Sequence, residues 1–202
     1  MICGSGRSGT TALALWVVNS GHFPFVADAS DVDSTLEITG INSAVQRRDD
    51  AALSKFRRNT QKEYSESFFC KAPTFELVAK QCPDVAAAWQ GANLIVMARD
   101  PIAVGCREKS VELSTDRHPV DVHLLRAVSR LHTTVIAATE LSATMGVALV
   151  SYEKLVTNGS DVASQFNEWV GCDGLLPLLW GASVRPNATG YIRKVMEDAT
   201  LP

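Results

Sequence analysis

Short apolar runs alternate along the chain with longer segments in which apolar residues recur at helical spacing. The clearest predicted strand is NLIVMARDP at 93–101, where five apolar residues are followed by polar groups and a proline. Shorter runs predict three more strands: MIC at 1–3, SFFCKAP at 67–73 and GVALVSYEKLV at 146–156. The run at 67–73 is ended by Pro73, and the run at 146–156 has a polar exit.

Helices are predicted between these strands. Their expected ranges are 11–21 with Gly21 as the stop, 34–46, a charged and solvated helix over 46–66, 74–83 closed by Pro83, 102–113, 121–145 and 161–171. Residues 85–92 are expected to form a turn-rich link, and the tail after 171 is expected to be irregular. Such alternation is typical of an α/β protein with a mainly parallel sheet.

Composition and charge argue against several classes of protein. The 202 residues, 46 % of them hydrophobic and 20 % charged, predict a single domain over 1–202. The net charge of −3 argues against a general nucleic-acid binder, and no apolar stretch is long enough to span a membrane. Five cysteines without CxxC spacing suggest reduced thiols rather than a disulfide framework or a zinc site. Because only three residues precede the first glycine loop, no secretory signal is expected, and the predicted compartment is the cytoplasm.

The loop GSGRSGTT, residues 4–11, follows the first predicted strand and opens a helix. A glycine-rich turn in this place directs backbone N–H groups toward one point and forms an anion site, most often for phosphate. A nucleoside triphosphate hydrolase would have G-x-x-x-x-G-K-[ST] here. In this chain Thr10 stands at the lysine position, and Arg7 provides a cation from the middle of the loop.

The stretch GRSGTT resembles the loop with which sulfotransferases bind the 5′-phosphosulfate of 3′-phosphoadenosine 5′-phosphosulfate (PAPS). Family loops commonly read P-[KR]-S-G-T-T. Five positions match that pattern, and Gly6 replaces the proline: Arg7, Ser8, Gly9, Thr10 and Thr11.

Three further segments resemble the same family, in the same order, across roughly residues 2–170. ARDPIAVGCR resembles the 3′-phosphate segment, with Arg99 in place and Arg107 where the family has a serine. CKAP resembles the K-D-P segment and supplies Lys71, and SYEKLV resembles the Y-E-D-L-V strand end. The family's C-terminal G-x-x-G-x-W-[KR] loop is missing, with NATGYIRK as a degenerate stand-in.

The resemblance implies a P-loop-type, three-layer α/β/α fold, PAPS as the cofactor and roles for particular residues. The backbone of residues 6–11 would hold the 5′-phosphate, and Arg7 would stabilise the bridging oxygen. Lys71 would lie near the transferred sulfuryl group, while Arg99 and Arg107 would pair with the 3′-phosphate. The family works without a metal, so no metal site is expected.

A hydroxyl acceptor needs a general base. In the family this base lies between the first helix and the second strand, where EITGIN fits the helix that follows a glutamate in bacterial relatives. The position favours Asp33, with Glu37 second, and capping of a helix by Asp33 is the plain structural alternative. The only histidine of this region, His22, is interpreted as a capping or surface residue.

Two other functions remain open from the sequence. A P-loop kinase or ATP-binding protein would need a compensating lysine and an aspartate after an apolar strand, a position near which Asp100 lies. A catalytically inactive sulfotransferase-like module would account for Arg107 and the missing C-terminal loop. The sequence does not identify the acceptor (a glycan, a small molecule or a tyrosine) or the oligomeric state. The basic residues at 47, 48, 57 and 58 fit a solvated helix face or an attraction for an anionic substrate.

Overall fold

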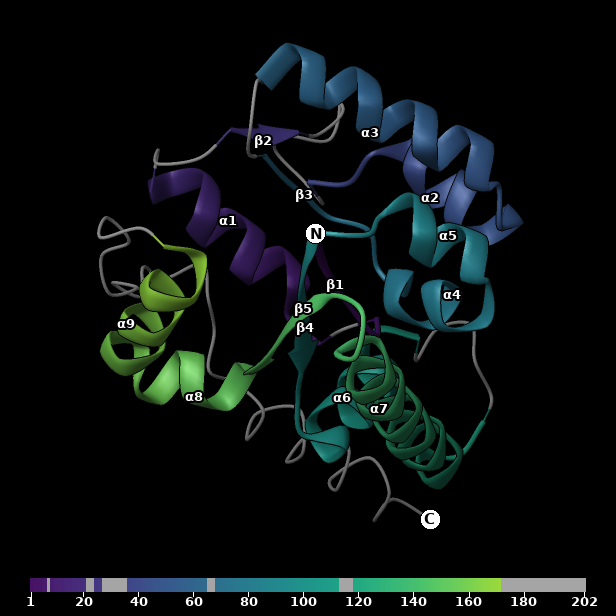
Figure 1. Cartoon of the computed structure of the whole chain (residues 1–202). Coiled ribbons are helices and arrows are strands. Elements are labelled where there is room, and N and C mark those ends of the chain that lie inside the picture. The colour runs from purple at the N-terminus through teal and green to yellow at the C-terminus, as the bar shows by residue number, and fades with distance from the viewer. Residues whose placement is uncertain (7, 21–23, 27–35, 65–67, 113–117, 172–202) are drawn as a thin grey trace, which may run out of the picture.

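The computed structural model describes residues 1–6, 8–20, 24–26, 36–64, 68–112 and 118–171. Strands and helices alternate through this part of the chain (Figure 1). The strands are β1 (Ile2–Gly4), β2 (Phe25–Val26), β3 (Phe69–Cys70), β4 (Asn93–Ala98) and β5 (Gly146–Ser151). The helices are α1 (Thr10–Ser20), α2 (Thr39–Arg47), α3 (Asp50–Tyr64), α4 (Phe75–Gln81), α5 (Pro83–Ala88), α6 (Pro101–Glu112), α7 (Val120–Leu141), α8 (Tyr152–Thr157) and α9 (Gly159–Val170).

All strand pairs of the described chain are parallel. The main sheet has the order β1-β4-β5, and β2 pairs with β3 beside it. A single bridge between Ile2 and Lys71 joins β1 to the end of β3, so the strands run side by side in the order β2-β3-β1-β4-β5. The expected α/β fold with a central parallel sheet is confirmed.

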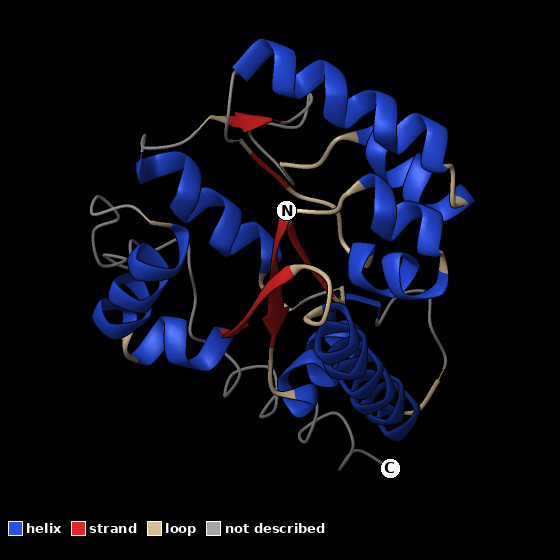
Figure 2. Cartoon of the chain, viewed as in Figure 1, coloured by secondary structure: helices blue, strands red, loops and turns tan. Residues whose placement is uncertain are grey.

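Alternate residues of the strands face two separate cores, as the period of two in a strand requires. Leu94 and Val96 of β4 pack with α2, α3, α4, α5 and α7, whereas Ile95 and Met97 pack with α1, α8 and α9. Figures 1 and 2 show these two sets of helices on opposite sides of the strands. Because both faces of β4 are covered, the strand is apolar without alternation, which is why its sequence was the clearest strand signal.

Two helices begin several residues later than expected. The helix predicted over 34–46 begins only at Thr39, because Leu36 has a left-handed φ of 56° and Ile38 is extended. The charged helix predicted over 46–66 starts at Asp50, because Arg48, also at φ 56°, ends α2. This charged helix is not simply solvated: Leu53 is fully buried against its neighbours.

Other expectations about local structure were wrong. Residues 85–92 are not merely a link, since α5 begins at Pro83, where proline occupies the first helical turn and lacks only an N–H that would be unpaired there. The strand predicted over 146–156 ends at Ser151, and α8 follows at once, with the Ser151 hydroxyl accepting the Lys154 N–H as its cap. The short strand β2 was not predicted.

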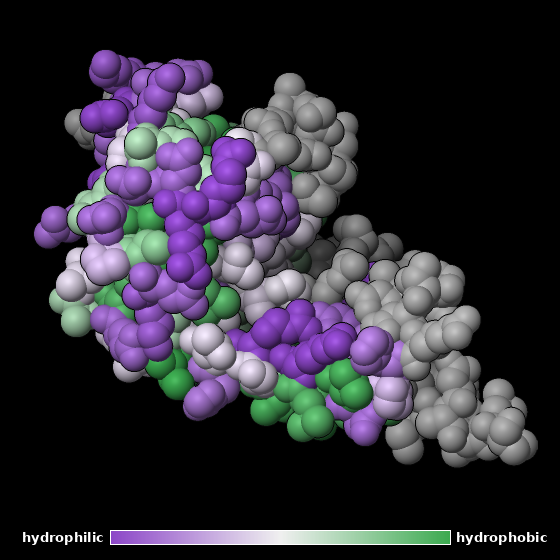
Figure 3. Space-filling model, turned by 90° about the vertical axis from the view of Figure 1, so that its right-hand side faces the viewer, coloured by the Kyte–Doolittle hydropathy of each residue, from purple (hydrophilic) through white to green (hydrophobic). Residues whose placement is uncertain are grey.

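The described part of the chain has a largely hydrophilic face and free cysteine thiols. Hydrophilic side chains cover much of the face shown in Figure 3, with apolar side chains in small separate groups. Within the described ranges, no helix combines the length and the apolar character needed to cross a bilayer. Four cysteines lie in these ranges, all as free thiols, and burial raises the pKa of Cys70 to about 11.

Candidate functional site

The residues singled out by the motifs lie at the carboxyl ends of neighbouring strands. The glycine loop follows β1, Lys71 follows β3, Arg99 follows β4 and Tyr152 follows β5. Because the strands are parallel and adjacent, these positions share one edge of the sheet, which is where α/β proteins bind ligands.

The loop is held in a tight backbone conformation at two glycines. Gly4 has a φ of 134°, and a Cβ there would lie 2.6 Å from the Met97 carbonyl oxygen on β4. Gly9 has a φ of 100°, which an L side chain rarely adopts. Between them the Ser8 N–H donates to the Ser5 carbonyl, and the Ser8 hydroxyl is buried without a hydrogen-bond partner in the described structure. The loop therefore leads to the start of α1 with a hydroxyl available to a ligand.

The ring of Tyr152 contacts both the glycine loop and Arg99. A Cβ on Gly9 would lie 2.3 Å from Tyr152 Cδ2, so the glycine backbone rests directly on the buried aromatic ring. The Arg99 guanidinium lies over the same ring, 4.2 Å from its centroid. Cation–π contacts of this kind hold a guanidinium in one plane while its N–H groups stay available to other partners. One tyrosine thus joins the glycine loop to Arg99.

Lys71 connects the loop helix to a carboxylate. Its Nζ donates to Thr11 Oγ1 at 2.8 Å and lies 2.9 Å from Glu37 Oε1. The second Glu37 oxygen, Oε2, accepts the Asn42 side-chain amide at 2.6 Å. Lys71 is 1 % exposed and Glu37 is 26 % exposed, so the cation is enclosed while the carboxylate keeps an open side. A buried ammonium requires such partners, because desolvation would otherwise favour its neutral form.

The polar residues after Arg99 organise the start of α6. The backbone N–H of Asp100 donates to Glu153 Oε1 at 3.0 Å, and Asp100 Oδ1 accepts the Ile102 N–H at 2.9 Å. Asp100 thus acts as a helix cap, and Glu153 fixes the turn that carries Arg99. Arg107 lies farther along α6 and is partly buried.

Several sequence candidates lie outside the described residues. These are Arg7, Asp33 and His22, and nothing in the structure tests their predicted roles. The described candidates fall into two groups, with Thr11, Lys71 and Glu37 in contact at one place and the Gly9–Tyr152–Arg99 stack at the other.

Two residues of this site were not anticipated in these roles. Tyr152 was part of SYEKLV but had no assigned role, and it is the common support of Gly9 and Arg99. Asn42 was part of EITGIN but had no assigned role, and it holds the second oxygen of Glu37. Its spacing of five residues from Glu37 could have suggested a contact across the start of a helix.

A hollow of about 460 Å³ opens next to Arg99. Its walls include Ala98 and Ser151, the residues directly before Arg99 and Tyr152, and Val162 and Phe166 from α9. Its lining is mainly apolar, and its volume lies in the range of ligand pockets.

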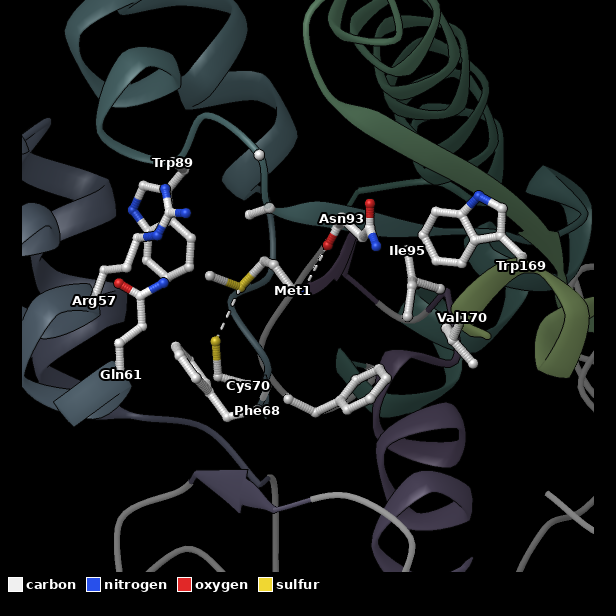
Figure 4. Close-up of a pocket in the computed structure, with 13 residues that line it drawn as sticks. Met1, Arg57, Gln61, Phe68, Cys70, Trp89, Asn93, Ile95, Trp169 and Val170 are labelled. Atoms are coloured by element: carbon white, nitrogen blue, oxygen red, sulfur yellow. Dashed lines mark hydrogen bonds between the residues drawn. The ribbon is translucent and has the colours of Figure 1, made fainter. Parts of the chain in front are cut away.

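A separate cavity of about 190 Å³ lies at the opposite ends of the strands (Figure 4). Met1 precedes β1 and Asn93 begins β4, so this cavity opens at the amino ends, away from the glycine loop. Figure 4 shows Arg57 beside Trp89 on one side of it and Trp169 on the other. Neither the glycine loop nor Lys71, Arg99 or Tyr152 lines it. Nor do the described histidines, cysteines and acidic residues form a group that could hold a metal ion.

Two solved structures are similar to this chain. The sulfotransferase domain from the curacin biosynthetic pathway matches 93 % of this chain and 80 % of its own length, with a TM-score of 0.53 and 15 % identity. The sulfotransferase domain from the Synechococcus PCC 7002 olefin synthase matches 100 % and 87 %, with a TM-score of 0.51 and 19 % identity. No protein-family model and no curated protein sequence matches the chain. The similarity establishes a sulfotransferase-like fold.

Proposed function

We propose that this chain is a PAPS-dependent sulfotransferase that transfers a sulfuryl group to a hydroxyl acceptor without a metal. The observation that carries the proposal is the contact of Lys71 with both Thr11 and Glu37. It brings a buried cation, the first turn of the loop helix and a partly exposed carboxylate to one point. These are the groups that transfer of a sulfuryl group to a hydroxyl requires.

The described residues suit PAPS as a ligand. The unpartnered hydroxyl of Ser8 and the N-terminal backbone of α1 would receive the 5′-phosphate, because helix N-termini leave N–H groups free for anions. Arg99, held over the Tyr152 ring, would pair with the 3′-phosphate, and the apolar hollow that Ala98 lines would accept the adenine ring. PAPS would supply the activated sulfuryl group. The predicted roles of Arg7 and Arg107 are kept as part of this proposal.

Lys71 provides fixed positive charge close to the loop. Its ammonium is enclosed, and its two partners hold it in position before any ligand arrives. Preorganised charge in a site without water stabilises a developing negative charge more strongly than a mobile side chain could. Lys71 thereby takes over the task that the lysine of a nucleotide-hydrolase loop performs from the position of Thr10.

Glu37 is the described candidate for the general base. A carboxylate accepts hydrogen bonds and protons, and a quarter of this side chain faces solvent, where an acceptor hydroxyl can approach. Lys71 and Asn42 fix the orientation of its two oxygens. Asp33 remains the other candidate, as the sequence predicts.

One observation weakens the kinase alternative. Asp100 would be the magnesium-binding aspartate of a kinase, but its carboxylate caps α6 through the Ile102 N–H. Lys71 is a cation in contact with the loop helix, as a nucleotide-binding function would need, so that function is included in the test. Only a measurement of turnover decides whether the chain is a catalytically inactive sulfotransferase-like module.

The first experiment measures thermal stabilisation by 3′-phosphoadenosine 5′-phosphate, with ADP and Mg-ATP for comparison. A ligand at 100 times its dissociation constant adds about 2.7 kcal/mol, which raises Tm by roughly 5–10 °C in a domain of this size. We expect this shift with the 3′-phosphorylated nucleotide alone, unchanged by EDTA. Arg99→Ala should reduce it to about half or less, and the exposed control Arg58→Ala on α3 should retain it.

Transfer is then measured with radiolabelled PAPS and a set of hydroxyl acceptors. We expect turnover in the presence of EDTA and its loss in Lys71→Met. A shift with Mg-ATP alone would replace the proposal with the kinase. Binding of the 3′-phosphorylated nucleotide without turnover on any acceptor would favour the inactive module.

A further inference from the structure

Glu76 is a fully buried acid that contacts the start of the glycine loop from the side of α4. It is 0 % exposed. Its Oε2 accepts the Gly4 backbone N–H at 3.2 Å, and its Oε1 accepts the Thr134 hydroxyl of α7 at 3.1 Å. The carboxyl group therefore links the last residue of β1 to the longest described helix.

The chain leading to Glu76 follows β1 as a partner strand would. Lys71 forms the bridge to Ile2, the Ala72 N–H donates to the Ile2 carbonyl at 3.0 Å, and the Thr74 N–H donates to the Gly4 carbonyl at 3.2 Å. Thr74 then has a left-handed φ of 65° and turns the backbone into α4. The Glu76 side chain receives the Gly4 N–H instead, so both polar groups of Gly4 are held by residues 74–76.

Gly4 is confined on its other side as well. A Cβ there would lie 2.6 Å from the Met97 carbonyl oxygen and 3.0 Å from Ser8 Oγ. The position of Gly4 therefore determines where the chain leaves the sheet and enters the loop, and it places Ser8. A buried N–H at this point that lost its acceptor would move toward another partner, because an unpaired buried polar group is costly.

Burial disfavours the charged form of the carboxyl group at this place. Burial raises the pKa of Glu76, and its titratable neighbour on β1 is the Cys3 thiol, whose pKa burial raises well above 9.0. A neutral carboxyl has one carbonyl-type acceptor and one donor, as the side chain of glutamine does. Glutamine is therefore a close substitute for Glu76, whereas aspartate is one methylene too short and methionine has no comparable acceptor.

We propose that Glu76 is a positioning residue for the phosphate loop. By accepting the Gly4 N–H from the side of α4, it sets the point from which the loop starts. Nucleotide affinity then depends on Glu76 although the side chain touches no ligand. The expected change in nucleotide affinity rests on the proposed function, whereas the expected change in the position of the loop does not.

Hydrogen exchange of the ligand-free protein tests the positioning directly. The protection of the Gly4 amide is compared with that of Val96 on the central strand in Glu76→Gln, Glu76→Asp and Glu76→Met. We expect Gly4 exchange, relative to Val96, to accelerate at least about 10-fold in the aspartate and methionine variants and to stay within about threefold of the parent in the glutamine variant. If the methionine variant does not fold, the aspartate and glutamine pair still decides. Unchanged Gly4 protection in the aspartate variant, or equal loss in the glutamine variant, overturns the proposal.

The dissociation constant for 3′-phosphoadenosine 5′-phosphate separates the two proposals. We expect it to rise about 10-fold in Glu76→Asp and to be restored in Glu76→Gln. Thr134→Val is the matched control, because it removes the hydrogen bond from Thr134 to Glu76 but leaves the acceptor for Gly4, and its affinity should remain near that of the parent. If the parent protein binds no nucleotide but the Glu76 variants show the expected exchange pattern, the proposed function is contradicted and the role of Glu76 is supported. If the parent protein and Glu76→Asp bind the nucleotide with equal affinity, the role of Glu76 is contradicted.

Discussion

Lys71 Nζ lies 2.9 Å from Glu37 Oε1, although 34 residues separate the two along the chain. The pair is asymmetric, since the lysine is enclosed and the glutamate is partly open to water. Removing one partner of a buried ion pair costs about 3–5 kcal/mol when the remaining charge stays buried, and less when water can reach it.

The asymmetry predicts which substitution is more harmful. Glu37→Gln leaves the enclosed ammonium without its counter-charge and should lower the free energy of unfolding by about 3 kcal/mol or more. Lys71→Met leaves a carboxylate that water can hydrate and should cost roughly 1–3 kcal/mol. Urea unfolding at pH 7 measures both values. A larger loss in Lys71→Met would contradict the enclosed position of the lysine.

Gly9 is predicted to tolerate no side chain. In Gly9→Ala the new Cβ meets the Tyr152 ring at 2.3 Å, and the φ of 100° adds backbone strain. The two effects each cost about 1–3 kcal/mol, so Tm should fall by roughly 5–15 °C, and nucleotide affinity should fall with it. Gly6→Ala is the matched control from the same loop, because nothing lies within 4 Å of its Cβ, and its stability should change by less than about 0.5 kcal/mol. Equal effects at both glycines would speak against the loop geometry.

Arg99 is predicted to discriminate the 3′-phosphate. The measurement is the ratio of the affinities for 3′-phosphoadenosine 5′-phosphate and for AMP, obtained by calorimetry. A hydrogen bond to a charged group contributes about 1.5–3 kcal/mol, so Arg99→Ala should reduce this ratio about 10–150-fold. Tyr152→Leu should reduce it less, because the guanidinium keeps its charge but loses the ring that orients it. A ratio unchanged in Arg99→Ala would remove this residue from the site.

Glu76 is predicted to make stability depend on pH. Folding raises its pKa above the ordinary 4.5, so the folded chain binds this proton more tightly than the unfolded chain. The resulting stabilisation is complete below the ordinary value and is lost as pH rises through the folded value. Tm of the parent minus Tm of Glu76→Gln should therefore decrease as the pH rises above the ordinary value of 4.5, measured by calorimetry. Groups common to both proteins cancel in this difference, and a difference that is flat or increases with pH would refute the assignment.

The sequence by itself determined the sheet and the edge at which the site lies. The apolar run of β4 and the glycine loop after β1 are local patterns, and the physics of strands and helix N-termini interprets them without knowledge of the fold. Because parallel strands share their carboxyl ends, Lys71, Arg99 and Tyr152, which follow β3, β4 and β5, lie at one edge of the sheet. The helix α5 was missed because Pro83 was interpreted only as the end of α4, whereas proline can also begin a helix.

The tertiary structure alone decided which of these groups touch. Lys71 reaches Glu37 because β3 lies beside β1 and the chain before α2 crosses near the loop helix, and no periodicity in the sequence encodes that approach. Glu76 stands in an ordinary helical segment, FELVAKQ, and its importance comes from the Gly4 N–H, 72 residues earlier in the chain. Hydrogen bonds and ion pairs act over a few ångströms, so contacts between distant segments depend on strand order and helix placement. Hydrophobic patterning specifies which side of an element is buried, but not which partner it meets there.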